Sequence, residues 1–146
     1  MDITHDLIVV EQHFDLPAKR LWEAITNHSE MIKWFFENIP TFSAEPGFYT
    51  EFNIHHEGRD FLHQWKILEV IPEQRIVYDW RYEQYDGVGR VEFELIKVIN
   101  GTNLRVSNYG LHTFPKDVPE FSIESCRAGW NYFIKDRLVA YLNQKV

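Results

Sequence analysis

The pattern of hydrophobic and polar positions changes period along the chain. Residues 7–14, LIVVEQHF, predict a strand. Residues 15–27, DLPAKRLWEAITN, predict a helix, because apolar residues recur at helical spacing and Pro17 occupies a favoured first helical position. A second short helix followed by a loop is expected in residues 28–40.

From Gly47 the period is two, and turn residues divide the segment into five strands: 48–56, 60–71, 75–84, 88–99 and 102–111. Asp86-Gly87 and Asn100-Gly101 indicate tight hairpins, since both central residues of a type I′ turn need positive φ. After Pro119 the period is helical again, with an apolar stripe of Ile123, Cys126, Trp130, Phe133, Ile134, Leu138 and Tyr141.

This order of elements predicts an α+β fold in a single domain, residues 1–146. We expect a curved six-stranded antiparallel sheet wrapped around a long C-terminal helix, with two short helices after the first strand. A helix across the concave face of the sheet covers the apolar stripes of both layers.

Tight turns fix the register of each hairpin and thereby the face of every side chain. A two-residue turn at 86–87 places Trp80 opposite Phe93, and one at 58–59 places Phe52 opposite Trp65. With similar turns at 73–74 and at 100–101, the inward residues are Phe52, Ile54, His56, Phe61, His63, Trp65, Ile67, Tyr78, Trp80, Tyr82, Val91, Phe93, Leu95, Leu104 and Val106.

Three histidines lie near the 58–59 turn. In this register His56 and His63 face inward, diagonally across the hairpin, and His55 faces outward; a β-bulge would bring His55 beside His63 instead. A zinc site needs three or four protein ligands, and the next inward candidate, Glu69, lies about 20 Å along the strand from His63. We therefore favour a core or rim histidine pair, then polar lining of a cavity, and expect no metal and no cofactor.

Aromatic residues make up 16% of the chain, and many of the inward rings carry a polar group. A buried N–H or O–H without a partner costs about 1–3 kcal/mol, so this composition suits a cavity wall better than a close-packed core. The alternative is that the final helix fills the space, with Trp130 and Tyr132 supplying bulk. A further aromatic group, in WFFENIPTF, either forms an apolar entrance or plugs one end of the core: Trp34, Phe35, Phe36 and Phe42.

The net charge of −7 opposes binding to nucleic acid, which needs clustered Lys and Arg. No stretch has the roughly 20 apolar residues that span a bilayer, and the N-terminus is acidic where a secretory signal would be basic, so we expect a cytoplasmic protein. The single cysteine, Cys126, excludes an internal disulfide and is expected to be a small core residue rather than a nucleophile.

The segment WKILEVIPEQRIVYDW resembles the Gly-x-Val-x-Glu-Val-x-Pro-Pro-x-Arg-Leu-Val-Tyr-x-Trp signature of the activator of heat shock protein 90 ATPase homologue family, within the START-like (SRPBCC) superfamily. FDLPAKRLWEAITNHSEMIKWF, NGTNLRVSNYGL and AGWNYFIKDRL extend the resemblance over essentially the whole chain. Trp65 replaces the family glycine before the third strand, and Glu73 replaces the second proline. An inward Trp65 would shrink a cavity or supply a stacking wall.

The resemblance implies a helix-grip fold with a pocket for an apolar small molecule between the sheet and the long helix, and no fixed catalytic set. The leading hypothesis is a binding domain for a hydrophobic or aromatic ligand, with these residues around it: Trp34, Phe35, Phe52, Ile54, His56, His63, Trp65, Ile67, Tyr78, Trp80, Phe93 and Trp130.

Two other hypotheses stay open. The first is a cyclase- or hydrolase-type enzyme with His56 or His63 as general base and Tyr78 or Tyr82 as acid. The second is a protein that stimulates a chaperone ATPase of the heat shock protein 90 class. A homodimer would fit the resemblance, although nothing in the sequence identifies its surface.

Overall fold

The computed structural model describes residues 7–143 and has the predicted α+β fold. The strands are β1 (Ile8–Phe14), β2 (Tyr49–His56), β3 (Arg59–Ile71), β4 (Arg75–Tyr82), β5 (Tyr85–Val98) and β6 (Gly101–Tyr109). The helices before β2 are α1 (Ala18–Thr26) and α2 (His28–Trp34). After β6 come η2 (Leu111–Thr113), η3 (Pro119–Phe121), α3 (Ile123–Asn131), η4 (Tyr132–Leu138) and α4 (Val139–Leu142).

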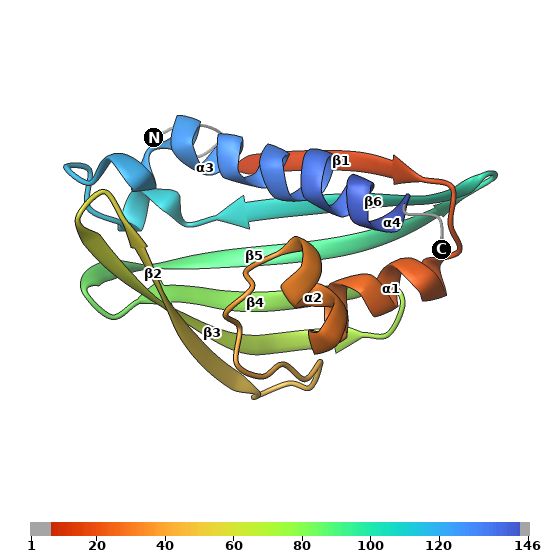
Figure 1. Ribbon diagram of the computed structural model, residues 1–146, viewed down its shortest axis with the longest axis horizontal. Helices are drawn as coiled ribbons and strands as arrows, with labels where there is room; N and C mark the ends of the chain where they lie inside the picture. Colours follow the sequence, from red (N-terminus) through yellow and green to blue (C-terminus); the bar gives the residue numbers. More distant parts are fainter. Residues whose placement is uncertain (1–6, 144–146) are drawn as a thin grey trace.

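The six strands form one antiparallel sheet in the order β1-β6-β5-β4-β3-β2. The segments α3, η4 and α4 continue one another as a single C-terminal helix, which lies on the same side of the sheet as α1 and α2 (Figure 1). The Tyr141 hydroxyl at the end of this helix donates to Glu30 of α2, 2.8 Å away. The sheet is thus covered on one face by two helical units that also contact each other.

Local sequence explains where these helices begin. The side chain of Asn27 accepts the backbone N–H of Ser29 at the start of α2, and Ser122 accepts that of Ser125 at the start of α3. Such caps satisfy amides that have no partner within the helix. Within residues 7–143, no helix combines the length and apolar character needed to cross a bilayer.

The predicted register of β4 with β5 is wrong. Trp80 lies opposite Gly89 rather than Phe93, because the turn falls at residues 83–84 and a bulge follows it. Gly87 instead lies inside β5 with φ of 125°, where an added Cβ would come within 2.5 Å of the Phe114 ring. The Asp-Gly pair therefore makes room for the segment after β6 instead of forming the hairpin turn.

The β2–β3 and β5–β6 registers are each shifted by two residues from the prediction. The first hairpin turns at 57–58, so Phe52 lies opposite His63, and Leu95 lies opposite Leu104 in the second. A shift by an even number leaves every side chain on its predicted face. Of the fifteen residues expected to face inward, fourteen are buried or half-buried, and His56 is exposed.

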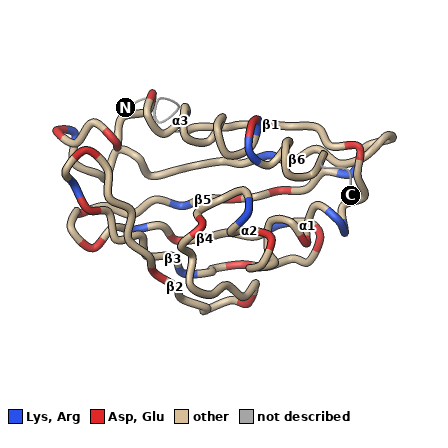
Figure 2. Tube along the Cα trace, viewed as in Figure 1, with Lys and Arg blue, Asp and Glu red and all other residues tan. Residues whose placement is uncertain are grey.

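A β-bulge between Ile67 and Glu69 corrects a further expectation. The extra residue reverses the alternation of sides, so Glu69 is exposed and its carboxylate lies 3.7 Å from Arg75. Within residues 7–143, Lys and Arg are dispersed along the trace, with no cluster of the kind a phosphate backbone requires (Figure 2).

Candidate functional site

A cavity of about 150 Å³ lies between the sheet and the C-terminal helix. It occupies the end of the interior where the tip of the β2–β3 hairpin meets the segment with η2 and η3, at the left in Figure 1. Its walls are mostly rings: Phe36, His63, Trp80, Tyr82, Gly89, Asn108, Leu111, Phe114, Glu120, Phe121, Cys126, Gly129, Trp130 and Phe133.

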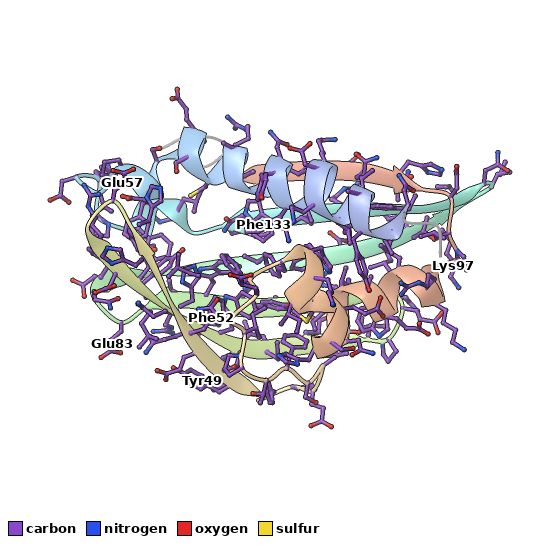
Figure 3. The ribbon with its side chains drawn as sticks, in the orientation of Figure 1. Tyr49, Phe52, Glu57, Glu83, Lys97 and Phe133 are labelled. Carbon is purple, nitrogen blue, oxygen red and sulfur yellow. The ribbon has the colours of Figure 1, made fainter. Side chains whose placement is uncertain are left out.

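The C-terminal helix leaves the cavity open because of one small residue. Gly129 lines it, and an added Cβ at this position would meet no atom within 4 Å. Glycine inside a helix lowers the stability of the helix by about 0.5–1 kcal/mol relative to alanine. The residue that keeps the cavity open therefore also destabilises the helix. Phe133, one turn further along, projects from the helix toward the sheet (Figure 3) and bounds the same space.

The tryptophan N–H groups in the cavity wall have partners. Trp80 Nε1 donates to the Tyr82 hydroxyl oxygen at 2.9 Å, and Trp130 Nε1 donates to Asn108 Oδ1 at 2.9 Å. Burial raises the pKa of Tyr82, which keeps the phenol protonated. These bonds hold both indole rings in fixed orientations.

His63 is the buried histidine of the cavity. Its Nδ1 lies 2.9 Å from the Phe61 carbonyl oxygen, and because a carbonyl only accepts, Nδ1 carries the proton. Burial lowers the pKa of His63 from 6.5 to about 4, so the ring is neutral near pH 7. The ring stacks on Phe52 at a centroid distance of 4.9 Å. His63 thus offers Nε2 as a hydrogen-bond acceptor.

An ion cluster closes one side of the cavity. Glu120 Oε2 accepts hydrogen bonds from His56 Nδ1 at 2.9 Å and Arg59 Nη1 at 3.1 Å. We call His56, Arg59 and Glu120 the latch, since it joins the β2–β3 hairpin to η3; Glu57 marks the hairpin tip in Figure 3. The His56 hydrogen bond lowers the pKa of Glu120, which is therefore ionised near neutral pH. The outer side of the latch lines a shallow depression, so Glu120 separates cavity from surface.

Cys126 borders the cavity from α3. Its thiol lies 3.6 Å from the Glu120 carbonyl oxygen, and burial raises the pKa of the thiol to about 11. A thiol with such a pKa is almost entirely protonated near pH 7 and is a poor nucleophile. Its contribution to this wall is apolar bulk.

The predicted ligand-binding residues fall into separate places. His63, Trp80 and Trp130 line the cavity, as does the predicted acid candidate Tyr82. His56 lies in the latch, and Ile54 is half-buried outside the lining. The others pack in the core and do not line the cavity: Trp34, Phe35, Phe52, Trp65, Ile67, Tyr78 and Phe93.

The predicted approach of His56 to His63 is wrong. In the observed register His56 lies opposite Arg59. Arg59 is four positions before His63 in β3, so His56 and His63 are separated by about 13 Å along the strand direction. No group of three or more potential metal-ligating side chains occurs within residues 7–143. The general-base hypothesis also meets an obstacle, because a histidine with a pKa of about 4 is a weak base at neutral pH.

Most of the cavity wall was not predicted from the sequence. The missed residues come largely from the segment 110–122 and from the inner side of α3, and include Phe114, Glu120, Phe121, Cys126 and Gly129. A signal was present in that segment, where Leu111, Phe114, Val118 and Phe121 recur every three or four residues around Pro115 and Pro119. All four are buried.

The sequence model described as "Activator of Hsp90 ATPase homolog 1-like protein" matches residues 15–143. The chain belongs to this family. A search of curated proteins finds no match to the chain. The family description names activation of the Hsp90 ATPase, and for this member a chaperone partner stays a prediction.

Solved structures share the fold over nearly the whole chain. A protein of Chromobacterium violaceum has 20% identity and a TM-score of 0.78, with 96% of this chain and 99% of that one covered. A protein of Mesorhizobium loti has 25% identity and a TM-score of 0.75, with 96% and 98% covered. DynU16, from the dynemicin biosynthetic locus, has 22% identity and a TM-score of 0.74; 95% of this chain matches 48% of that one. These likenesses support the helix-grip architecture.

Proposed function

We propose that this family member binds a small apolar or aromatic molecule in the cavity beside Gly129. The observation that carries the proposal is the cavity itself, a hollow of about 150 Å³ walled mostly by aromatic rings. An apolar cavity of about that volume holds a molecule the size of benzene. The ligand is therefore of single-ring size.

The wall chemistry supports binding of an apolar ring. Trp80 and Trp130 approach each other edge to face at 5.7 Å, and Phe114 and Phe121 lie 5.1 Å apart on the facing segment. Rings in such arrangements present both faces and edges to a planar guest, and each aromatic contact adds about 0.5–1.5 kcal/mol beyond the area that it buries. The ion pair between Arg59 and Glu120 is held at one side of the cavity, in the latch.

The test is a titration of benzene, toluene and ethylbenzene, followed by calorimetry and by thermal unfolding. We expect saturable binding of one molecule per chain and a melting temperature that rises by several degrees at 100 times the dissociation constant. Gly129→Leu should abolish binding, because the new side chain occupies the cavity. Ala128→Leu is the matched control, as this neighbouring residue is exposed.

Two results would contradict the proposal. One is the absence of binding by the whole series at concentrations near ligand solubility. The other is equal affinity in the parent protein and in a folded Gly129→Leu variant, which would place the bound molecule elsewhere.

A further inference from the structure

One carboxylate oxygen of the latch has no partner. Glu120 Oε2 accepts hydrogen bonds from both His56 and Arg59, whereas Oε1 is buried and accepts no hydrogen bond from the described residues. A buried acceptor without a donor is costly, and more so when it is charged. Glu120 lines the cavity, so a bound molecule is a source of the missing donor.

A second acceptor stands in the same wall. With its proton on Nδ1, His63 has a lone pair on Nε2, and no hydrogen bond to this atom is formed within residues 7–143. The ring is buried among aromatic side chains, including Tyr82 at a centroid distance of 4.8 Å. His63 lines the cavity, so a bound molecule is a source of a donor for Nε2.

The donors of the cavity wall are almost all used. Trp80 donates to Tyr82 and Trp130 donates to Asn108, so neither indole N–H is left for a ligand. The Tyr82 oxygen accepts the Trp80 bond, while the Tyr82 hydroxyl hydrogen has no acceptor among the described residues. The wall therefore combines two free acceptors with one free donor.

We propose that the ligand of this cavity is a neutral single-ring compound with a hydroxyl group, such as a phenol. The hydroxyl donates to Glu120 or His63 and accepts from Tyr82, while the ring lies between the aromatic walls. This inference rests on the proposed function, since it specifies the ligand of the same cavity.

A neutral hydroxyl fits better than an ammonium group. Arg59 lies 3.1 Å from Oε2 of the same carboxylate and balances its charge, so a cationic ligand would add an uncompensated charge to an apolar site. Only a group that both donates and accepts can use the free atoms of Glu120 and Tyr82 together.

The experiment compares three probes of similar size by calorimetry on the full chain: phenol, toluene and anisole. Phenol donates and accepts, anisole only accepts, and toluene does neither. We expect phenol to bind about 10- to 100-fold more tightly than toluene, the usual range for a hydrogen bond to a charged group. If the wall had no free polar atoms, toluene would bind more tightly than phenol, since phenol must give up its hydrogen bonds to water.

The variant Glu120→Gln tests the assigned acceptor. Its amide oxygen can keep the bonds to His56 and Arg59, which turns the amide NH₂ toward the former Oε1 position and replaces an acceptor by a donor. Phenol affinity should fall at least 10-fold, anisole affinity should rise, and toluene affinity should stay the same. Glu92→Gln is the matched control, because Glu92 is also buried and bonded to an arginine, Arg75, but lies on the outer face of the sheet.

Each outcome decides between the proposals. If toluene binds as tightly as phenol or more tightly, the cavity is a ligand site but the hydroxyl inference is wrong. If no probe binds, the proposed function fails and the inference fails with it. Should Glu120→Gln not fold, His63→Phe removes the second acceptor, and a phenol preference that persists there undiminished contradicts the inference.

Discussion

The interior between sheet and helices is filled at the end that holds Trp65 and hollow at the end that holds Gly129. Trp65 is fully buried, with the ring centroids of Phe52, Trp80 and Tyr78 at 4.8, 5.0 and 5.1 Å. At the other end, Gly129 leaves open space opposite the strands. Both ends are rich in rings, so the difference comes from the size of single side chains.

The two ends also differ in whether their buried polar groups have hydrogen-bond partners. The difference is the opposite of the one expected from the sequence. Trp65 Nε1, the Tyr78 hydroxyl and Thr50 Oγ1 are buried at the filled end without hydrogen-bond partners. At the hollow end the N–H groups of Trp80 and Trp130 are bonded. Polar groups on aromatic rings therefore do not mark the cavity in this protein.

The largest expected effect is that of Trp65→Ala, which would make the filled end hollow. Removing a fully buried tryptophan should lower the free energy of unfolding by about 3–5 kcal/mol, because packing and burial are lost together. Chemical denaturation measures this change, with Trp65→Phe as a milder control. A loss below about 1 kcal/mol would contradict close packing at this end.

Acid should act on the hollow end through His63. Since the folded pKa of about 4 lies below the unfolded value of 6.5, the unfolded chain takes up the proton first as the pH falls. The free energy of unfolding should therefore decrease by about 3 kcal/mol between pH 6.5 and 4. Denaturation of the parent protein and of His63→Phe across this range isolates the effect. Parallel pH profiles would contradict a buried neutral histidine.

Gly129→Ala should separate stability from binding. The added methyl meets no atom, so the helix gains up to about 1 kcal/mol while the cavity becomes smaller. We expect a higher melting temperature and a weaker affinity for toluene. Combining it with Ala128→Gly, at an exposed neighbour, should cancel the stability gain and leave the weaker affinity. An unchanged affinity would show that the methyl does not enter the cavity.

The smallest expected effect concerns the latch. Arg59→Ala removes a partly exposed ion pair, so the free energy of unfolding should change by about 1 kcal/mol or less. Toluene should enter and leave faster, as measured by stopped-flow tryptophan fluorescence. Arg81→Ala, which breaks an ion pair with Asp79 on the outer face, serves as the control. Equal rates in both variants would exclude the latch as a barrier.

The sequence allowed the fold and the faces of the strands to be predicted, but not the registers. The alternation of apolar and polar residues correctly predicted that Phe52 and Trp80 point inward. Register errors of two or four residues did not affect this prediction, because an even shift leaves every side chain on the same face of the sheet. The Asp-Gly pair at residues 86–87 gave a wrong position for the hairpin turn. Gly87 leaves room for the ring of Phe114, a residue that is distant in sequence, and a Cβ there would clash with that ring.

The position of the cavity was less predictable than the fold. Four of its fourteen lining residues come from residues 110–122, which carry neither a strand period nor a long helical period. The contrast between Trp65 and Gly129 depends on which side chains face each other across layers, and this follows only from the assembled structure. Trp65 is buried in the core and does not line the cavity, so neither role considered for it is tested, and of the predicted ring contacts only His63, Trp80 and Trp130 line the cavity.

The central claim, that the hollow beside Gly129 is a ligand site, is tested most directly by a crystal structure of the protein soaked in bromobenzene. We expect an anomalous bromine peak between Trp80, Phe114 and Trp130, and its disappearance in Gly129→Leu. A cavity without the peak, or a peak that survives the leucine, would contradict it.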